Sequence, residues 1–370
     1  MTTTALVYDE RCLAHDNGST IVDARAREWL DAPHPESAAR IARSLAVLQA
    51  SSVADRLEPV AARAATGDDL ALVHSREHVG RIRAACNSDA PIVVGPQARA
   101  GGGSWEPALL SAGGTLAAVD HVLAGRSRNA YVLCRPPGHH ASRDTAMGFC
   151  LFNNVAIAAR HAQREHGLER IAIVDWDVHH GNGTHDTFYE DGSVLFVSLH
   201  QDALYPEDAG RAQDTGGGDG VGATVNVPLP AGTGDRGYLL AFERIVVPAL
   251  RAFGPELVLV SAGQDPAASD PLGRMSVTTE GFRAMTGAIE DAADDLCDGR
   301  LVAVQEGGYS ADHLPYCVLA IVERLAELSP ALPGDPLEID VPSSLRDWEA
   351  DAVDEIAAAV GRGGVAIGAE

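Results

Sequence analysis

Residues 171–183, which read Ile-Ala-Ile-Val-Asp-Trp-Asp-Val-His-His-Gly-Asn-Gly, join a buried strand to a row of metal-binding side chains. The opening apolar run is rich in β-branched side chains, which predicts a fully buried strand. Asp175, Asp177 and His179 follow at every second position, and an extended backbone would point all three the same way. Two carboxylates and an imidazole in that arrangement suit a cation. The glycines that close the stretch allow a sharp turn into the next helix.

The chain around this stretch alternates between predicted strands and helices. From residue 130 onward we expect strands at 130–134, 171–174, 194–199, 257–261 and 301–305, and helices at 153–166, 183–189, 235–253, 279–298 and 312–325. The N-terminal part adds a strand at 3–8, helices at 36–50, 68–73, 76–86 and 105–123, and loops at 10–35 and 87–103. This alternation predicts an α/β fold whose mostly parallel sheet carries helices on both faces.

The composition favours a single domain. The 370 residues are 46% hydrophobic, and no linker rich in Pro, Ser or Gly divides them. We therefore expect 1–370 to form one domain, with 330–370 as a peripheral C-terminal segment that ends in a helix at 347–360. The chain lacks both an apolar run of roughly 18 residues and a basic N-terminal region, which predicts a cytoplasmic protein that does not enter a membrane.

The charge and the cysteines narrow the class of protein further. The formal charge of −24, from 52 acidic and 28 basic groups, argues against nucleic acid as a partner, because phosphate contacts need clustered Lys and Arg. An acidic field attracts cationic amines, but it also keeps a protein in solution, and we favour the second interpretation. The six cysteines are widely scattered without a Cys-x-x-Cys pair, so we expect reduced core thiols.

Polar clusters follow five of the predicted strands. They are Arg135–His140, Asp175–His179, Ser198–His200, Ser261–Pro266 and Gln305–Tyr309. Each alone has an ordinary explanation, such as a strand-end cap, a surface histidine pair or a packed turn. In an open parallel sheet, however, the carboxyl ends of the strands share one edge, and ligands bind there. The joint occurrence of the clusters therefore predicts a site at that edge.

Asp177, His179 and Asp265 are the candidate zinc ligands. A catalytic zinc takes three protein ligands with N, O or S donors and leaves a fourth position open for water. Two carboxylates leave the ion less electrophilic than three histidines would, so neighbouring groups must add to catalysis. The ligand set does not fix the metal, since iron or cobalt suits the same donors.

Further catalytic candidates belong to the same edge. One imidazole of the pair His139 and His140, held by a Pro-Pro-Gly loop, can take a proton from water and deliver it to a leaving nitrogen. Asp175 is then available to orient one histidine, and Asn182 the other. Tyr309, carried on a Gly-Gly turn, is a donor for a developing oxyanion.

Four motifs resemble the histone deacetylase family. They are Arg135-Pro-Pro-Gly-His-His-Ala141, Gly148-Phe-Cys-Leu-Phe-Asn-Asn154, Asp175-Trp-Asp-Val-His-His-Gly-Asn-Gly-Thr184 and Gln305-Glu-Gly-Gly-Tyr309. The sequence is most similar to the class II branch and to the bacterial histone-deacetylase-like amidohydrolases of the acetylpolyamine amidohydrolase superfamily. The similarity runs from about Tyr8 to Leu325. It implies the arginase/deacetylase fold and a single deacetylase-like catalytic domain.

The resemblance also implies roles for individual residues. Asp177, His179 and Asp265 would bind one zinc ion per chain, the histidine pair would be the general acid and base, and Tyr309 would polarise the scissile carbonyl. A potassium ion is expected near Asp175, Asp177, His179, Ser198 and Leu199, partly on main-chain oxygens.

Substrate contacts follow from the same comparison. Gly148 and Phe149 match one wall of a narrow acyl-lysine tunnel, and Tyr205 matches the other, where it replaces a second phenylalanine. The segment His34-Pro35-Glu36 resembles the loop that precedes the tunnel.

The sequence departs from the family pattern at three places. Gln264 stands before the zinc aspartate where relatives carry an apolar or aromatic residue, so it could support the site or bind substrate. Residues 87–103 hold no counterpart of the aspartate that grips the substrate main chain in many members, which weighs against peptides. Leu272 replaces a glutamate of polyamine-selective relatives, which weighs against polyamines.

Together these features predict a zinc-dependent amide hydrolase that uses zinc-activated water to remove an acyl group, acetyl most simply, from an acylated amine. Acetyl-lysine in protein and a small-molecule amide both remain open as substrates, and a homo-oligomer is possible. The alternatives are an acetylpolyamine deacetylase, a two-metal ureohydrolase and a non-catalytic acyl-lysine binding module. The ureohydrolase would need an aspartate where Ala267 stands, and a dead binder would lack the tyrosine or a zinc ligand.

Overall fold

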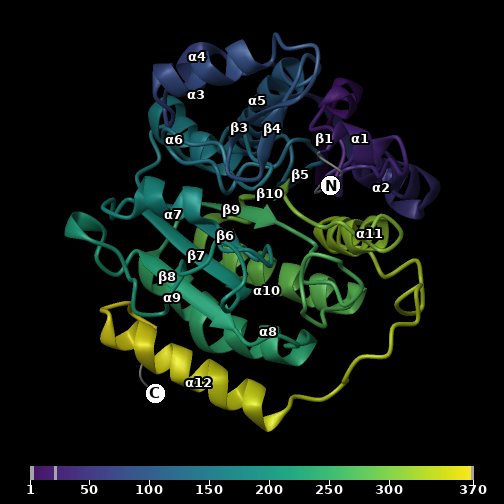
Figure 1. The fold of residues 1–370 in the computed structure, drawn as a ribbon. Helices are drawn as coiled ribbons and strands as arrows, with labels where there is room; N and C mark the ends of the chain where they lie inside the picture. Colours follow the sequence, from purple (N-terminus) through teal and green to yellow (C-terminus); the bar gives the residue numbers. More distant parts are fainter. Residues whose placement is uncertain (1–3, 21–22, 368–370) are drawn as a thin grey trace.

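A parallel sheet of eight strands organises the fold of this computed structural model, which describes residues 4–20 and 23–367 (Figure 1). The strands lie in the order β2-β1-β5-β10-β9-β6-β7-β8, and every neighbouring pair is parallel. They are β1 (Thr4–Tyr8), β2 (Leu57–Ala61), β5 (Asn129–Val132), β6 (Ile171–Asp175), β7 (Val194–Gln201), β8 (Thr224–Leu229), β9 (Leu257–Ala262) and β10 (Leu301–Gln305). The predicted α/β fold with a mostly parallel sheet is confirmed.

Helices cover both faces of this sheet (Figure 1). The hydrophobic cluster on one face takes in α3 (Gly67–Leu70), α4 (Arg76–Ala85), α5 (Trp105–Leu123), α6 (Asn154–His166) and α7 (Asn182–Phe188). The cluster on the other takes in α2 (Ala38–Ala50), α8 (Asp235–Ala241), α9 (Val247–Phe253), α10 (Thr279–Cys297) and α11 (Leu314–Leu325). The helix expected at 235–253 is continuous, with a π-helical turn, Phe242–Val246, between α8 and α9.

Strand β6 shows why the central strands have uninterrupted apolar sequences. Ile171 and Ile173 pack with the cluster that contains α5 and α6, whereas Ala172 and Val174 pack with the cluster that contains α8 and α10. Successive side chains of a strand point to opposite faces, so helices on both sides bury all four. Full burial of an Ile or Val side chain contributes about 1.5–3 kcal/mol relative to exposure.

Two segments expected to be loops contain regular structure. Residues 87–103 include an antiparallel hairpin of β3 (Ile92–Gly95) and β4 (Ala98–Ala100). Residues 10–35 include a 3-10 turn, Glu10–Ala14, and the short helix α1 (Ala24–Arg27). The sequence pattern also gives no sign of β2, because this edge strand is only half-buried or exposed along its length.

The C-terminal helix α12 (Asp347–Arg362) lies along the outside of the molecule (Figure 1). Its inner face nevertheless contributes to the core, since Val353, Ile356 and Val360 are buried and pack in the cluster that contains β8 and α8. The segment expected to be peripheral is therefore peripheral in position but part of the core in packing.

Two further expectations are that the chain has no membrane-spanning helix and that its cysteines are reduced and lie in the core. Among residues 4–20 and 23–367, no helix has the length and apolar character needed to span a bilayer. All six cysteines are buried as free thiols.

Candidate active site

The polar clusters that follow the strands meet at one edge of the sheet. Strands β5, β10, β9, β6 and β7 are consecutive neighbours, so their carboxyl ends lie side by side. Asp175, the last residue of β6, is in register with Ser261 of β9 and Ser198 of β7. The prediction that these strand ends converge is confirmed.

Asp177, His179 and Asp265 form a buried group whose possible ligand atoms all lie within 4.8 Å of one another. His179 Nδ1 is 3.0 Å from Asp177 Oδ1 and 3.1 Å from Asp265 Oδ2. Asp265 Oδ2 is buried and accepts no hydrogen bond from the described residues. The second oxygens are held by main-chain N–H groups, that of Gly307 on Asp177 Oδ2 and that of Val178 on Asp265 Oδ1, both at 2.8 Å. This donor set fits a divalent cation.

Two glycines make room for these carboxylates. A Cβ atom on Gly307 would lie 2.1 Å from Asp265 Oδ2 and 2.5 Å from Asp177 Oδ2. One on Gly263 would lie 2.3 Å from Asp177 Oδ2. The main chain of the Gly-Gly-Tyr turn therefore closes one side of the ligand group at a distance that only glycine allows.

The histidine pair is held by the two partners that the sequence suggested. His139 Nδ1 lies 2.9 Å from Asp175 Oδ2, and His140 Nδ1 lies 2.7 Å from Asn182 Oδ1. The two rings are 4.0 Å apart between centroids. Because both Nδ1 atoms are engaged, the Nε2 atoms are the ones left for substrate and water.

The two histidines differ in their preferred protonation state. Burial lowers the pKa of His139, but the carboxylates of Asp177 and Asp175 outweigh it and hold that pKa well above its ordinary value. Burial also lowers the pKa of His140, and the charges of His139 and His179 lower it further. Environments that separate two pKa values divide the acid from the base. His139 is suited to hold a proton, and His140 to accept one.

Glu306 fixes the loop that carries the histidines. Its Oε2 accepts hydrogen bonds from the main-chain N–H groups of Gly138 at 2.6 Å and His139 at 3.2 Å. Burial raises the pKa of Glu306 to about 7. The residue belongs to the Gln305–Tyr309 motif, so one motif supports both the tyrosine and the histidine loop.

Tyr309 enters the site from a turn held by Asp270. Asp270 Oδ2 accepts the N–H of Tyr309 at 2.5 Å and that of Ser310 at 3.2 Å, while Oδ1 accepts the N–H of Leu272 at 2.9 Å. Burial raises the pKa of Tyr309 well above its ordinary value, so the phenol keeps its proton and can donate it in a hydrogen bond.

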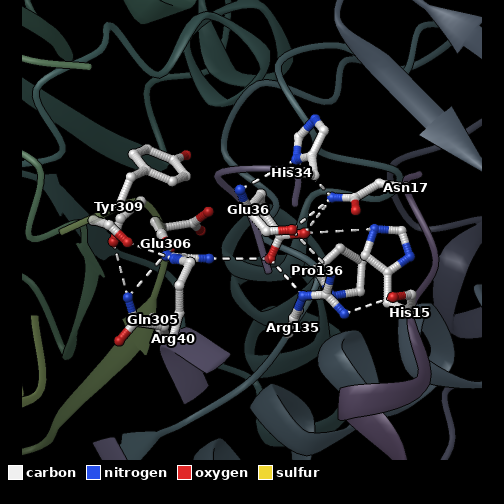
Figure 2. Close-up of polar contacts among 12 residues, drawn as sticks. His15, Asn17, His34, Glu36, Arg40, Arg135, Pro136, Gln305, Glu306 and Tyr309 are labelled. Carbon is white, nitrogen blue, oxygen red and sulfur yellow. Dashed lines mark hydrogen bonds and ion pairs between the residues drawn. The ribbon is translucent and has the colours of Figure 1, made fainter. Parts of the chain in front are cut away.

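Behind the turn lies a buried chain of charges, Arg40–Glu36–Arg135 (Figure 2). Arg40 lies 4.8 Å from the centre of the Tyr309 ring and donates hydrogen bonds to the carbonyl oxygens of Gly308 and, at 2.7 Å, Glu306. Glu36 Oε1 accepts from Arg40 at 3.0 Å and from Arg135 at 2.7 Å. Arg40, in the first turn of α2, thus supports the main chain of the Gly-Gly-Tyr turn.

A cavity of about 190 Å³ reaches His140, His179 and Tyr309. The residues predicted to form the tunnel line it. They are Gly148, Phe149, Tyr205 and Leu272, together with His140, His179 and Tyr309. Gly148 has φ +52°, and a Cβ there would lie 2.2 Å from His140. Phe149 holds the uncommon φ of +68°, with its ring 5.8 Å from that of Tyr309. Such backbone strain is typical of functional sites.

Gln264, expected among the substrate contacts, does not line the cavity. It is buried, donates to the Tyr131 hydroxyl at 3.2 Å and accepts from Gln305 Nε2 at 2.6 Å. The Gln264 side chain therefore points into the sheet edge and supports β10. Of the two roles that the sequence left open, this position agrees with support of the site and not with a substrate contact.

Ser198 and Leu199 lie in β7, the neighbour of β6, and both are fully buried. The Ser198 Oγ atom is 3.1 Å from His200 Nδ1.

Arg40, Asp270 and Glu306 are site residues whose roles the sequence did not reveal. Glu306 lies within the Gln305–Tyr309 motif, but the partners of Glu306 and Asp270 are 168 and 39 residues away in the chain. Arg40 follows the loop-like His34–Glu36 segment by one helical turn. Only the fold brings these partners together.

Comparison with known proteins identifies the family. A family model described as "Histone deacetylase domain" matches residues 34–325. The chain belongs to the histone deacetylase family. A histone deacetylase-like amidohydrolase of Pseudomonas aeruginosa is 42% identical over 367 residues, covering 97% of this chain and 96% of that protein. A "probable deacetylase" of Archaeoglobus fulgidus is 38% identical over 326 residues, covering 87% and 86%.

Solved structures agree with this assignment. The crystal structure of the HD domain of HDA15 is 34% identical, superposes with a TM-score of 0.86, and covers 98% of this chain and 95% of that chain. The resemblance noted in the sequence is confirmed, and so is the arginase/deacetylase fold. As a histone deacetylase family member, the chain is a hydrolase of amide bonds that acts on an acylated substrate.

Proposed function

We propose that this deacetylase is zinc-dependent and removes an acyl group, acetyl most simply, from a primary amine on a flexible chain. The observation that carries the proposal is the buried group Asp177, His179 and Asp265, whose His179 lines a cavity together with Tyr309 and His140. When bound there, zinc supplies Lewis-acid chemistry that polarises a carbonyl and lowers the pKa of water.

The chain's own residues divide the remaining work. His140, whose pKa is lowered by burial, accepts the proton of the attacking water at Nε2. His139, whose Nδ1 lies 2.9 Å from Asp175 Oδ2, stabilises negative charge and supplies a proton to the leaving nitrogen from Nε2. The Tyr309 hydroxyl donates a hydrogen bond to the carbonyl oxygen as negative charge develops on it.

The shape of the cavity supports a linear substrate. Phe149 and Tyr205 line it with aromatic rings, and the Tyr205 ring is nearly perpendicular to that of His140, with centroids 5.2 Å apart. A methylene chain packs well against aromatic rings, which favours a linear amine. Leu272 presents an apolar side chain at the same cavity, which gives no partner for the second ammonium group of a polyamine.

We also propose a potassium site beside the catalytic group, formed by Asp175, Asp177, His179, Ser198 and Leu199. It is supported by the register of Asp175 with Ser198 and by their complete burial. Such an ion would hold the strand end in the geometry that orients His139.

The test is turnover of a fluorogenic acetyl-lysine amide by metal-stripped and zinc-restored protein, with metal content measured by elemental analysis. We expect activity to vanish on stripping and to return with about one zinc per chain. Asp265→Asn should lose both zinc and activity. The matched control Asp312→Asn changes an aspartate whose side chain is 81% exposed, and should lose neither. A folded, zinc-loaded protein without turnover on a broad amide panel would favour a binding module.

A further inference from the structure

The mouth of the catalytic cavity opens into a second cavity of about 300 Å³. The two share Gln97, Phe149 and Leu272, so a substrate chain that leaves the tunnel enters this space directly. Neither cavity has an aspartate or glutamate among its lining residues, although the chain carries 52 acidic groups. The entrance cavity does contain an arginine, Arg99. The entrance is thus locally cationic in an acidic protein.

Only part of the Arg99 guanidinium is used in hydrogen bonds to the described residues. It lies in β4 opposite Val93, and its Nη2 donates to the carbonyl oxygen of Pro91 at 3.0 Å. Its Nε is buried and has no partner among residues 4–20 and 23–367, and no described carboxylate pairs with the guanidinium. The side chain as a whole is half-buried and lines the cavity, so its exposed part is open to a ligand, and a guanidinium without a counter-charge matches a carboxylate in a two-point geometry. Both facts favour an anionic ligand.

The hairpin holds this guanidinium at a fixed distance from the tunnel. The N–H groups of Gly148 and Phe149, on the tunnel wall, donate to the carbonyl oxygens of Pro96 and Gln97 in the hairpin turn, both at 3.0 Å. Gly95 packs so closely that a Cβ would lie 1.8 Å from the carbonyl oxygen of Ala146. A charge mounted on a rigid element loses little entropy when it binds, so it discriminates well between substrates.

The acidic groups near the entrance do not line the cavity and do not pair with Arg99. Glu36 is committed to two arginines deeper in the fold, at 2.7 and 3.0 Å. Asp16 and Asp31 use a carboxylate oxygen for the N–H of Gly18 and the hydroxyl of Ser19 respectively, and neither lines the cavity.

We propose that the entrance cavity binds a carboxylate carried by the substrate, with Arg99 as its partner, so that the enzyme selects acylated amines that are acids. This inference rests on the proposed deacylase function and names its substrate class. The carboxylate has two sources, the free acid of a small N-acyl amino acid or an acidic side chain beside an acyl-lysine in a peptide. The chemistry at Arg99 is the same for both.

The experiment uses two matched pairs of substrates and the zinc-loaded full chain. The first pair is an Nα-blocked Nε-acetyl-lysine with a free carboxylate and its carboxamide. The second pair is a short acetyl-lysine peptide with glutamate next to the acetyl-lysine and the same peptide with glutamine. Each is assayed with wild type, Arg99→Gln and the control Arg126→Gln, which alters an exposed arginine in the turn after α5.

In wild type we expect kcat/KM to be about tenfold higher for the acidic member of at least one pair, mainly through KM, as for one charge-assisted hydrogen bond. This ratio should shrink as ionic strength rises. Arg99→Gln should bring it to about one, and Arg126→Gln should preserve it. A preference confined to the first pair identifies a small acid as the source, and one confined to the second identifies an acidic peptide.

Equal rates within both pairs in wild type, or a preference that survives Arg99→Gln, would overturn the carboxylate site and leave the deacylase intact. Absence of turnover for all four substrates would overturn the deacylase instead. Calorimetric titration of the same compounds then decides the site. Tighter binding of the acid by wild type but not by Arg99→Gln supports it, and equal binding refutes it.

Discussion

Tyr309 reaches the catalytic cavity from a turn that is held independently of its hydroxyl. Asp270 binds the main chain of the turn, and the Arg40 guanidinium lies 4.8 Å from the ring centre. Replacement by phenylalanine should therefore keep the ring in place and remove only the oxyanion donor. We expect Tyr309→Phe to lower kcat by about 10²–10³.

Zinc content and melting temperature should be unchanged in this variant, because no ligand atom is altered. Tyr316→Phe, at a half-buried tyrosine outside the catalytic cavity, is the matched control and should keep full activity. If Tyr309→Phe turned over acetyl-lysine at the wild-type rate, the donor role would be wrong.

At the residue scale, the sequence was most informative where one strand end carries several chemical groups. Asp177 and His179 are two residues apart, so their common position follows from local geometry alone. Asp265 could be added because it follows another predicted strand. By contrast, nothing local marks Asp270 as the acceptor for the Tyr309 N–H. The sequence left two roles open for Gln264, because the direction of a side chain just beyond a strand is set by its neighbours in the fold.

Helix α2 contributes to the site through Arg40 in its first turn. Arg40 uses three nitrogens for three acceptors, which are the Gly308 carbonyl, the Glu306 carbonyl and the Glu36 carboxylate. A lysine keeps the charge but cannot span all three positions. We expect Arg40→Lys to lower kcat about tenfold by loosening the Gly-Gly-Tyr turn, and to cost about 1–3 kcal/mol of stability.

Arg43→Lys is the matched control, one turn further along the same helix. Arg43 is half-exposed and pairs with Asp312, so its replacement should change neither kcat nor stability measurably. A loss of stability in Arg40→Lys without any loss of kcat at saturating substrate would show that the arginine supports the fold only.

At the element scale, prediction succeeded where burial is two-sided. Ile171–Asp175 and Leu257–Ala262 are buried at every position and carry the apolar runs from which a parallel strand is recognised. Strand β2 has no such signal, because the sheet edge leaves it half in solvent. The β3–β4 hairpin was missed for a similar reason, since Ile92 and Val93 are exposed and the surrounding prolines and glycines have loop composition. That hairpin carries Arg99 and was therefore absent from the predicted site.

Across the whole molecule, the net charge and the charge of one buried cluster differ in sign. The chain is strongly acidic, yet its buried catalytic edge is stabilised by arginines, with Glu36 as the single carboxylate between Arg40 and Arg135 (Figure 2). Burial opposes ionisation of Glu36, but the charge of Arg135, aided by that of Arg40, outweighs it and lowers the pKa to about 2 from an ordinary 4.5. Folding therefore stabilises the ionised carboxylate of Glu36 relative to its protonated form.

A carboxyl whose pKa falls on folding stabilises the protein above its unfolded pKa and loses that contribution as pH falls through the folded value. For Glu36 the window runs from pH 4.5 down to about 2. Glu36→Gln should cost about 3–5 kcal/mol at pH 7, since it leaves two buried guanidinium groups without a counter-charge. Denaturant titrations of wild type and variant should converge as pH falls from 4.5, because protonation removes the same charge from wild type. Glu243→Gln, an exposed control, should follow wild type throughout. Stability curves for Glu36→Gln that stay parallel to wild type across this window would mean that Glu36 is not ionised in the folded protein.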